Sequence, residues 1–234
     1  MIGFVAIEVG EGAPLGCVRC AAPAPAVYHP TDVIVAQIAA EADAWQGVPG
    51  PNIVLTGPEP FAHPALPELV SACVEAGFER IAIETDGGAL ASPAHATGAL
   101  GAGVRHLYVR VLAANQAAAD ALAGRPGLGR AVATGVAAYR EAASRAGASV
   151  AVTVIVPVCR HTLDALPATI AMLSAWEIDA IRLVPAGDVP ASASAVVAAA
   201  CDTGMVNRMW VEADPTLALP ESHRLHHVAG GWSR

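Results

Sequence analysis

The sequence predicts an α/β fold, a partial barrel of six strand–helix units. Short apolar runs rich in β-branched residues alternate with helical stretches, and Gly or Pro stands at most of the joints, a pattern typical of βα units around a parallel sheet. Most of the runs are apolar throughout, as expected when helices cover the sheet. The 234 residues, 54% of them hydrophobic, suffice for one such domain with a buried core.

The predicted strands lie, in chain order, at Phe4–Val9, Asn52–Thr56, Arg80–Glu84, His106–Val111, Ser149–Val156 and Ala180–Val184. Helices are predicted between and after them, near residues 32–45, 67–76, 92–100, 115–123, 128–146 and 164–175. Ser92 and Pro93 suit an N-cap and a first helical position, and Gly77 and Gly147 suit C′ positions. Six units are too few for a closed eight-stranded barrel, so we expect an open one.

The rest of the chain is expected to pack on the same domain. Residues 1–190 form the predicted barrel, and residues 191–234 add a helix near 192–200, a strand at Met209–Glu212 and a polar tail. In the tail, His223 and His227 are spaced to share a helix face. No acidic or cysteine partner stands at a matched spacing, so we interpret them as solvated.

The charged residues exclude several classes of protein. All 13 basic residues are arginines, so Schiff-base aldolases and pyridoxal-phosphate enzymes, which need a lysine amine, are excluded. The net charge of −8 and the lack of a basic stripe argue against nucleic acid as a partner. No apolar run approaches the roughly 20 residues of a membrane span. Glu8 and Glu11 do not suit a secretory signal, so we expect a cytoplasmic protein.

The five cysteines are an odd number, which argues against a disulfide framework. Cys73 lies on the apolar face of a predicted helix and Cys201 follows an alanine-rich helix, so both are most simply core residues. Cys17, Cys20 and Cys159 fall on predicted loops. The loop cysteines are therefore the candidates for chemistry.

Polar residues gather where the predicted strands end, which is the side on which βα folds place their active sites. The residues at this edge are Cys17, Arg19, Cys20, Gly57, Pro58, Glu59, Pro60, Glu84, Thr85, Asp86, Arg110, Asn115, Cys159, Arg160, His161 and Asp188. Among them, a glycine turn lets the backbone approach a ligand, and Glu59 can accept hydrogen bonds from an ammonium. A plain turn with a solvated Glu59 is the alternative.

Two of these segments resemble motifs of the radical S-adenosylmethionine (SAM) superfamily. The segment Thr56–Pro60 reads T-G-P-E-P where that family has T-G-G-E-P, and Thr85–Gly87 reads T-D-G where it has T-N-G. The resemblance covers roughly residues 3–188. It implies SAM binding by Thr56, Gly57, Pro58, Glu59, Pro60, Thr85 and Asp86. Pro58 replaces a glycine and so removes one N–H donor.

The first unit departs from the family pattern I-E-x-T-x-x-C-x-x-x-C-x-x-C. Residues 7–20 read IEVGEGAPLGCVRC, which puts Ala13 at the first cysteine and Arg19 before the third. The resemblance implies that Cys17 and Cys20 would ligate a [4Fe–4S] cluster, but alanine offers no donor.

Three interpretations of this loop stay open. In the first, the cluster is lost. In the second, another side chain completes it: Cys159 is the best candidate, and His161, His29 and Glu11 are weaker ones. In the third, alanine is an engineered replacement in a working enzyme, or Cys17 and Cys20 hold something else, such as zinc.

The fourth predicted strand often ends S-L-D-G in the family and here carries Arg110. If Arg110 points into the barrel, it could meet a carboxylate, that of SAM included. The alternative is an arginine that faces outward or pairs with Glu84.

The resemblance leads to two functions. One is a degenerate, non-radical relative that binds SAM or acts as a partner subunit in a peptide- or natural-product-modifying pathway. The other is an active enzyme that cleaves SAM to a 5′-deoxyadenosyl radical with an atypical or engineered cluster site. A third class, a barrel hydrolase or isomerase using Glu84, Asp86 and His161, has only generic support. The expected partners are a small molecule or peptide substrate and another protein.

Overall fold

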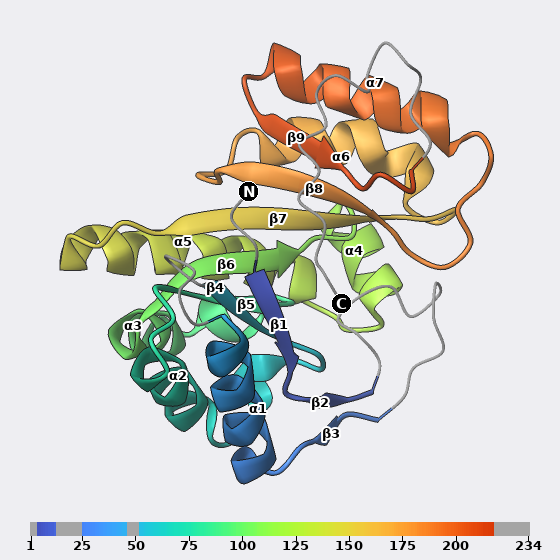
Figure 1. The fold of residues 1–234 in the computed structure, drawn as a ribbon. Coiled ribbons are helices and arrows are strands. Elements are labelled where there is room, and N and C mark those ends of the chain that lie inside the picture. Colours follow the sequence, from blue (N-terminus) through green and yellow to red (C-terminus); the bar gives the residue numbers. More distant parts are fainter. Residues whose placement is uncertain (1–3, 13–24, 46–51, 218–234) are drawn as a thin grey trace.

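The computed structural model describes residues 4–12, 25–45 and 52–217. Its centre is a parallel sheet in the order β1-β4-β5-β6-β7-β8-β9 (Figure 1). These strands are β1 (Phe4–Glu8), β4 (Asn52–Thr56), β5 (Arg80–Thr85), β6 (Val104–Arg110), β7 (Ala151–Val158), β8 (Ala180–Pro185) and β9 (Trp210–Ala213). A second, antiparallel pair consists of β2 (Gly10–Glu11) and β3 (Val27–Tyr28). The predicted α/β fold is confirmed, with β9 as the added seventh strand.

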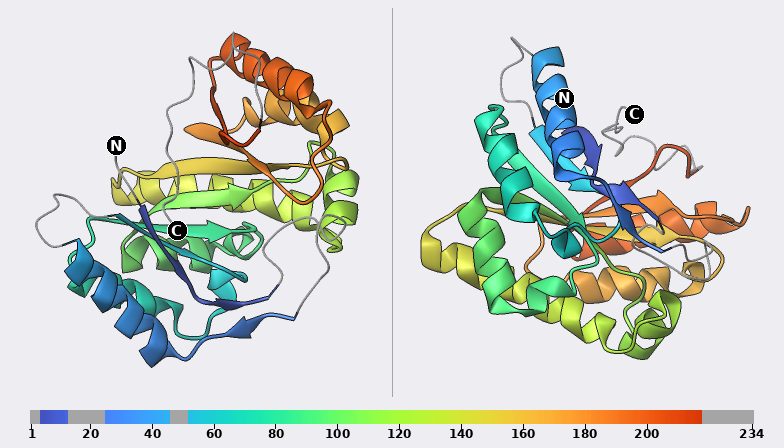
Figure 2. Two further views of the ribbon diagram at one scale, coloured as in Figure 1. Left: turned by 45° about the vertical axis from the view of Figure 1, so that its right-hand side comes forward. Right: turned by 90° about the horizontal axis from the view of Figure 1, so that it is seen from below.

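The helices of the described segments lie along the outer side of the curved sheet (Figure 2). The α-helices are α1 (Thr31–Ala44), α2 (Leu66–Glu75), α3 (Pro93–Ala102), α4 (Gln116–Ala123), α5 (Leu128–Ala146), α6 (Leu166–Leu173) and α7 (Ala193–Val206). The described segments also contain the short 3₁₀ helices η1 (Pro60–Ala62), η2 (Ala89–Ala91) and η3 (Leu163–Ala165). Among the helices of the described segments, none is long and apolar enough to span a membrane.

Local sequence signals explain several helix ends. Ser92 occupies the N-cap of α3 and Pro93 its first position, although the Ser92 side chain makes no capping hydrogen bond. Gly147 ends α5 at φ +62°, and Gly77 follows α2 at φ +89°. Both glycines adopt the left-handed conformation that a helix terminus favours and a side chain would oppose.

The two faces of the sheet differ in chemistry because side chains alternate along each strand. The outward residues pack with the helices into the main core, which includes Ile7, Leu55, Ile83, Leu107, Val154 and Leu183. The inner face carries a thin apolar layer of Val54, Ala82, Tyr108 and Ile155. Polar residues share this inner face, among them Arg110 and Arg182, which flank Ile155 in register. The inner face is therefore the more polar one.

The C-terminal elements extend the same sheet. Strand β9 pairs with β8 in parallel register from Ala180–Trp210 to Leu183–Ala213, and α7 contacts both α6 and β9. The division of the chain at residue 190 stays a prediction.

Candidate functional site

The Glu59 carboxylate joins the ends of β4 and β5. Glu59 Oε1 accepts a hydrogen bond from Phe61 N at 3.0 Å, at the start of η1. The Thr85 hydroxyl donates to both Glu59 oxygens at 2.8 and 2.9 Å, and Asp86 N donates to Oε2 at 2.9 Å. The structure thus brings the predicted T-G-P-E-P and T-D-G segments together through this one carboxylate.

The turn that carries Glu59 lies close to the chain after β1. Gly57 has φ +110°, and a Cβ added there would lie 3.0 Å from Gly10 O. A side chain at position 57 would therefore be strained in conformation and crowded by backbone. On the other side of the turn, the Tyr28 hydroxyl donates to Glu59 O at 2.9 Å. The Tyr28 and His63 rings meet edge to face, 5.3 Å apart.

The Glu59 carboxyl is perturbed electrostatically. Burial, and after it the negative charge of Asp86, raise the pKa of Glu59 to about 8, although the donors from Asp86, Phe61 and Thr85 act to lower it. Burial and the charges of Glu59 and Asp86 also raise the pKa of Tyr28, which keeps its hydroxyl a donor. The Glu59 carboxylate with its donors Phe61 N, the Thr85 hydroxyl and Asp86 N forms what we call the Glu59 cradle. A cation bound beside Glu59 would favour the ionised carboxylate, so this cradle suits an ammonium group.

Asp86 is itself held from two sides. Its Oδ1 accepts a hydrogen bond from Gly88 N at 2.8 Å, and its Oδ2 forms an ion pair with Arg125. Residue 86 is only 4% exposed. Since Arg125 belongs to the segment between α4 and α5, it links that segment to the end of β5.

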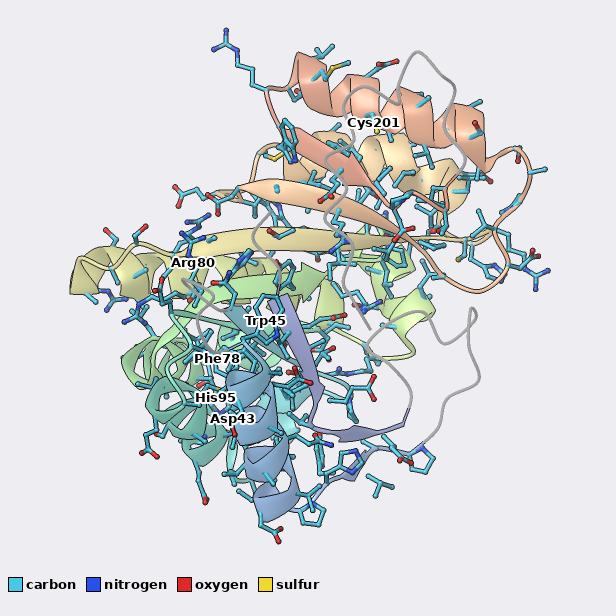
Figure 3. The ribbon with its side chains drawn as sticks, in the orientation of Figure 1. Asp43, Trp45, Phe78, Arg80, His95 and Cys201 are labelled. Atoms are coloured by element: carbon cyan, nitrogen blue, oxygen red, sulfur yellow. The ribbon has the colours of Figure 1, made fainter. Side chains whose placement is uncertain are left out.

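Arg110 points to the inner face of the sheet, one of the two directions considered for it. There it forms an ion pair with Glu84, the partner named in the alternative. The Thr56 hydroxyl donates to the other Glu84 oxygen at 3.0 Å. Arg110 Nε is buried, and no hydrogen-bond partner for it lies within residues 4–12, 25–45 or 52–217. A ligand carboxylate is one group that would satisfy such a donor. Arg80, by contrast, stands at the other end of β5 (Figure 3).

The structure describes only some of the predicted metal ligands. Cys17 and Cys20, together with Ala13 and Arg19, lie outside the described residues. Cys159 follows β7 at the predicted edge but is 1% exposed in a small apolar cluster. Cys201 lies on α7, away from the ends of β4 and β5 (Figure 3). In the described part of the chain, no group of three or more His, Cys, Asp or Glu residues is arranged to hold a metal ion.

The donor set does not fit a cluster held in the family manner. Two loop cysteines remain where three thiolates are needed, and Ala13 has no lone pair to give. The alternative donors His161, Glu11 and His29 are exposed or half-exposed on separate segments. His161 Nε2 lies 3.3 Å from Arg160 Nε, and Glu84 and Asp86 each form an ion pair with an arginine.

Sequence reasoning missed Tyr28 and Arg125. Each contacts the site over a long stretch of chain: Tyr28 lies 31 residues from Glu59, and Arg125 lies 39 residues from Asp86. Neither residue stands in a recognisable motif. Arg125 lies between the two predicted helices near 115–123 and 128–146, and the sequence around it gives no indication of its ion-pair partner.

Solved structures share this fold at low sequence identity. SuiB of Streptococcus suis, in its structure bound to S-adenosylmethionine, superimposes with a TM-score of 0.66 and 12% identity over 90% of this chain and 50% of SuiB. SuiB bound to its precursor peptide SuiA gives 0.64 and 10% over 91% and 48%. Methylornithine synthase (PylB) gives 0.60 and 11% over 89% and 64%. The chain thus spans about half the length of SuiB.

No curated protein sequence matches the chain significantly. The family model of the radical SAM superfamily, however, matches residues 7–173, from the end of β1 through α6. This range contains both motif segments and the strands that bring them together. The chain therefore belongs to the radical SAM superfamily.

Proposed function

We propose that the protein binds SAM at the C-terminal ends of its strands and does not cleave it reductively. The observation that carries the SAM site is the Glu59 carboxylate, which Thr85 and Asp86 hold between the two motif segments. This carboxylate would receive the ligand's ammonium. The buried Nε of Arg110 is suited to the ligand's carboxylate.

The loss of radical chemistry rests on the donor set. A [4Fe–4S] cluster of this family supplies the electron that cleaves SAM, and its three thiolates would be Cys17, Cys20 and the residue at position 13. Ala13 cannot take that part. Arg19 and Pro58 are two further departures from the family pattern near the same cofactor.

The chain's role in a pathway is proposed by analogy of fold. SuiB has been solved with the precursor peptide SuiA, and its fold resembles that of this chain. We therefore place the protein in a peptide- or natural-product-modifying pathway, in the cytoplasm, with a peptide or small-molecule substrate or as the partner subunit of an intact enzyme.

One observation favours the second candidate, an active enzyme with an atypical cluster site. Cys159 follows β7 at the same edge of the sheet as Glu59 and could supply a third thiolate. Its 1% exposure opposes this role, because the thiol would have to leave an apolar cluster to reach iron.

Calorimetric titration of the full chain with SAM tests the binding proposal. We expect saturable binding with one site per chain, and a loss of roughly tenfold or more in affinity for Glu59→Gln, which keeps the shape but removes the charge. Glu68→Gln, an exposed carboxyl on α2, is the matched control and should bind as the wild type does. Absence of binding, or equal affinities for Glu59→Gln and wild type, would contradict the proposal.

A further inference from the structure

The ion pair between Arg125 and Asp86 lies next to the Glu59 cradle, since Asp86 N is one of the donors to Glu59. The Asp86 side chain is 6% exposed, whereas that of Arg125 is 57% exposed, so the arginine reaches in from the surface to a nearly buried carboxylate. Among the described residues, Arg125 is the one that forms an ion pair with Asp86. Gly88 N completes the contacts of the Asp86 carboxylate.

Asp86 acts on Glu59 in two opposite ways. Its backbone N–H donates to Glu59 Oε2, which favours the ionised form. Its own negative charge disfavours that form. An aspartate is also a departure from the T-N-G of the family, where the residue is uncharged. The charge at position 86 therefore needs a nearby cation if Glu59 is to carry a charge as well.

We propose that Arg125 is a positioning residue that, through Asp86, favours the ionised form of the Glu59 carboxyl and orients it for a cationic ligand. The identity of that ligand as SAM rests on the proposed function. Arg125 neutralises Asp86 and fixes the turn after β5, which carries the Thr85 hydroxyl and Asp86 N–H that hold Glu59.

Other charged or titratable groups around Glu59 come from each neighbouring element. Tyr28 approaches from β3, and His63 follows η1 and contacts the Tyr28 ring. Glu84, next to Thr85, is paired with Arg110 on the inner face. Of the described arginines, it is Arg125 that pairs with Asp86, the residue whose charge raises the pKa of Glu59.

The first test needs no ligand. The full chain is labelled with ¹³C at glutamate carboxyls, and Glu59→Gln identifies the Glu59 signal in an NMR pH titration. Arg125→Gln should raise the Glu59 midpoint by about half a pH unit, less at high salt because Arg125 is largely exposed. Arg125→Lys should restore the wild-type midpoint. Arg130→Gln, an exposed arginine five residues on, should not change it.

An unchanged midpoint in Arg125→Gln, or an equal shift in Arg130→Gln, would overturn the inference. Calorimetry with SAM then examines the ligand. Below the Glu59 midpoint, Arg125→Gln should bind SAM roughly threefold more weakly than wild type, and the difference should vanish above both midpoints. Titration of the ligand's own amine is common to both proteins and cancels.

The two proposals can fail separately. Wild-type protein that binds no SAM would contradict the proposed function, while the NMR titration would still decide the role of Arg125. A loss of SAM affinity that is the same at every pH, and that Arg125→Lys does not restore, would show a merely structural arginine and overturn the inference.

Discussion

At the scale of single residues, Glu59 is the group on which the proposed SAM site depends, and its burial also has a cost for the stability of the fold. Its carboxyl is held by neutral donors and faces Asp86, so ionisation is opposed until a cation arrives. Groups with such perturbed pKa values cluster at functional sites. The chain therefore keeps a buried carboxyl whose ionisation destabilises the fold, and Glu59→Gln would remove that cost.

The raised pKa of Glu59 predicts a pH-dependent stability. Because the folded pKa is about 8 and the ordinary value 4.5, the native state retains a proton that the unfolded chain releases. The contribution of Glu59 to stability is thus fully present below about pH 4.5 and falls as the pH rises to about 8. The free energy of unfolding, measured with urea, should fall in the wild type relative to Glu59→Gln by a few kcal/mol over this pH range. A difference independent of pH would contradict the assignment.

Binding of SAM should also release protons. At pH 7 the Glu59 carboxyl is mostly protonated in the free protein, and an adjacent ammonium would ionise it. Titrations in two buffers of different ionisation enthalpy should therefore give different apparent binding enthalpies. Glu59→Gln should abolish the part of that difference that comes from the protein, and equal enthalpies for wild type in both buffers would count against a protonated Glu59.

At the scale of elements, α5 supports the turn that ends β5. A Cβ added at Gly135 would lie 2.5 Å from Gly87 O and 2.8 Å from the Leu90 Cβ, so the helix can approach η2 only because residue 135 has no side chain. Tyr139 anchors the same helix, since its buried hydroxyl donates to Val104 O at 3.0 Å. The position of the T-D-G segment thus depends on the packing of α5.

Gly135→Ala should destabilise the protein and weaken the site together. The clash with backbone must displace α5 or the turn, at a cost of roughly 1–3 kcal/mol in the free energy of unfolding. The matched control is Gly98→Ala in α3, where an added Cβ meets nothing within 4 Å. That variant should gain about 0.5–1 kcal/mol from helix propensity. Urea unfolding checks both, and similar effects of the two substitutions would contradict the packing argument.

At the scale of the whole molecule, the strand predictions succeeded because buried parallel strands are apolar runs, as at Asn52–Thr56, whose predicted and observed bounds agree. Strand β7 runs on through Pro157 to Val158, two residues beyond the expected end, because Pro157 pairs in register with Val184. The direction of Arg110 could not be predicted, since a shift of one residue reverses a strand side chain. The contacts of Tyr28 and Arg125 depend on tertiary packing and left no local pattern.

The molecule as a whole combines the fold of the radical SAM superfamily and the proposed SAM site with a loop that has Ala13 at the position of the first cysteine. The fold belongs to a superfamily whose chemistry needs three thiolates, and the sequence holds Ala13 in place of one. Ala13→Cys restores the family pattern with Cys17 and Cys20 and should therefore take up iron where the wild type does not. Cys73→Ala, which changes a buried core thiol of α2, should leave iron uptake unaltered.

Anaerobic reconstitution of the full chain with iron and sulfide, followed by iron analysis and reduction in the presence of SAM, tests the central claim most directly. We predict sub-stoichiometric iron in the wild type and no 5′-deoxyadenosine on reduction. About four irons per chain together with 5′-deoxyadenosine would contradict the account and would identify an active enzyme with an atypical ligand set.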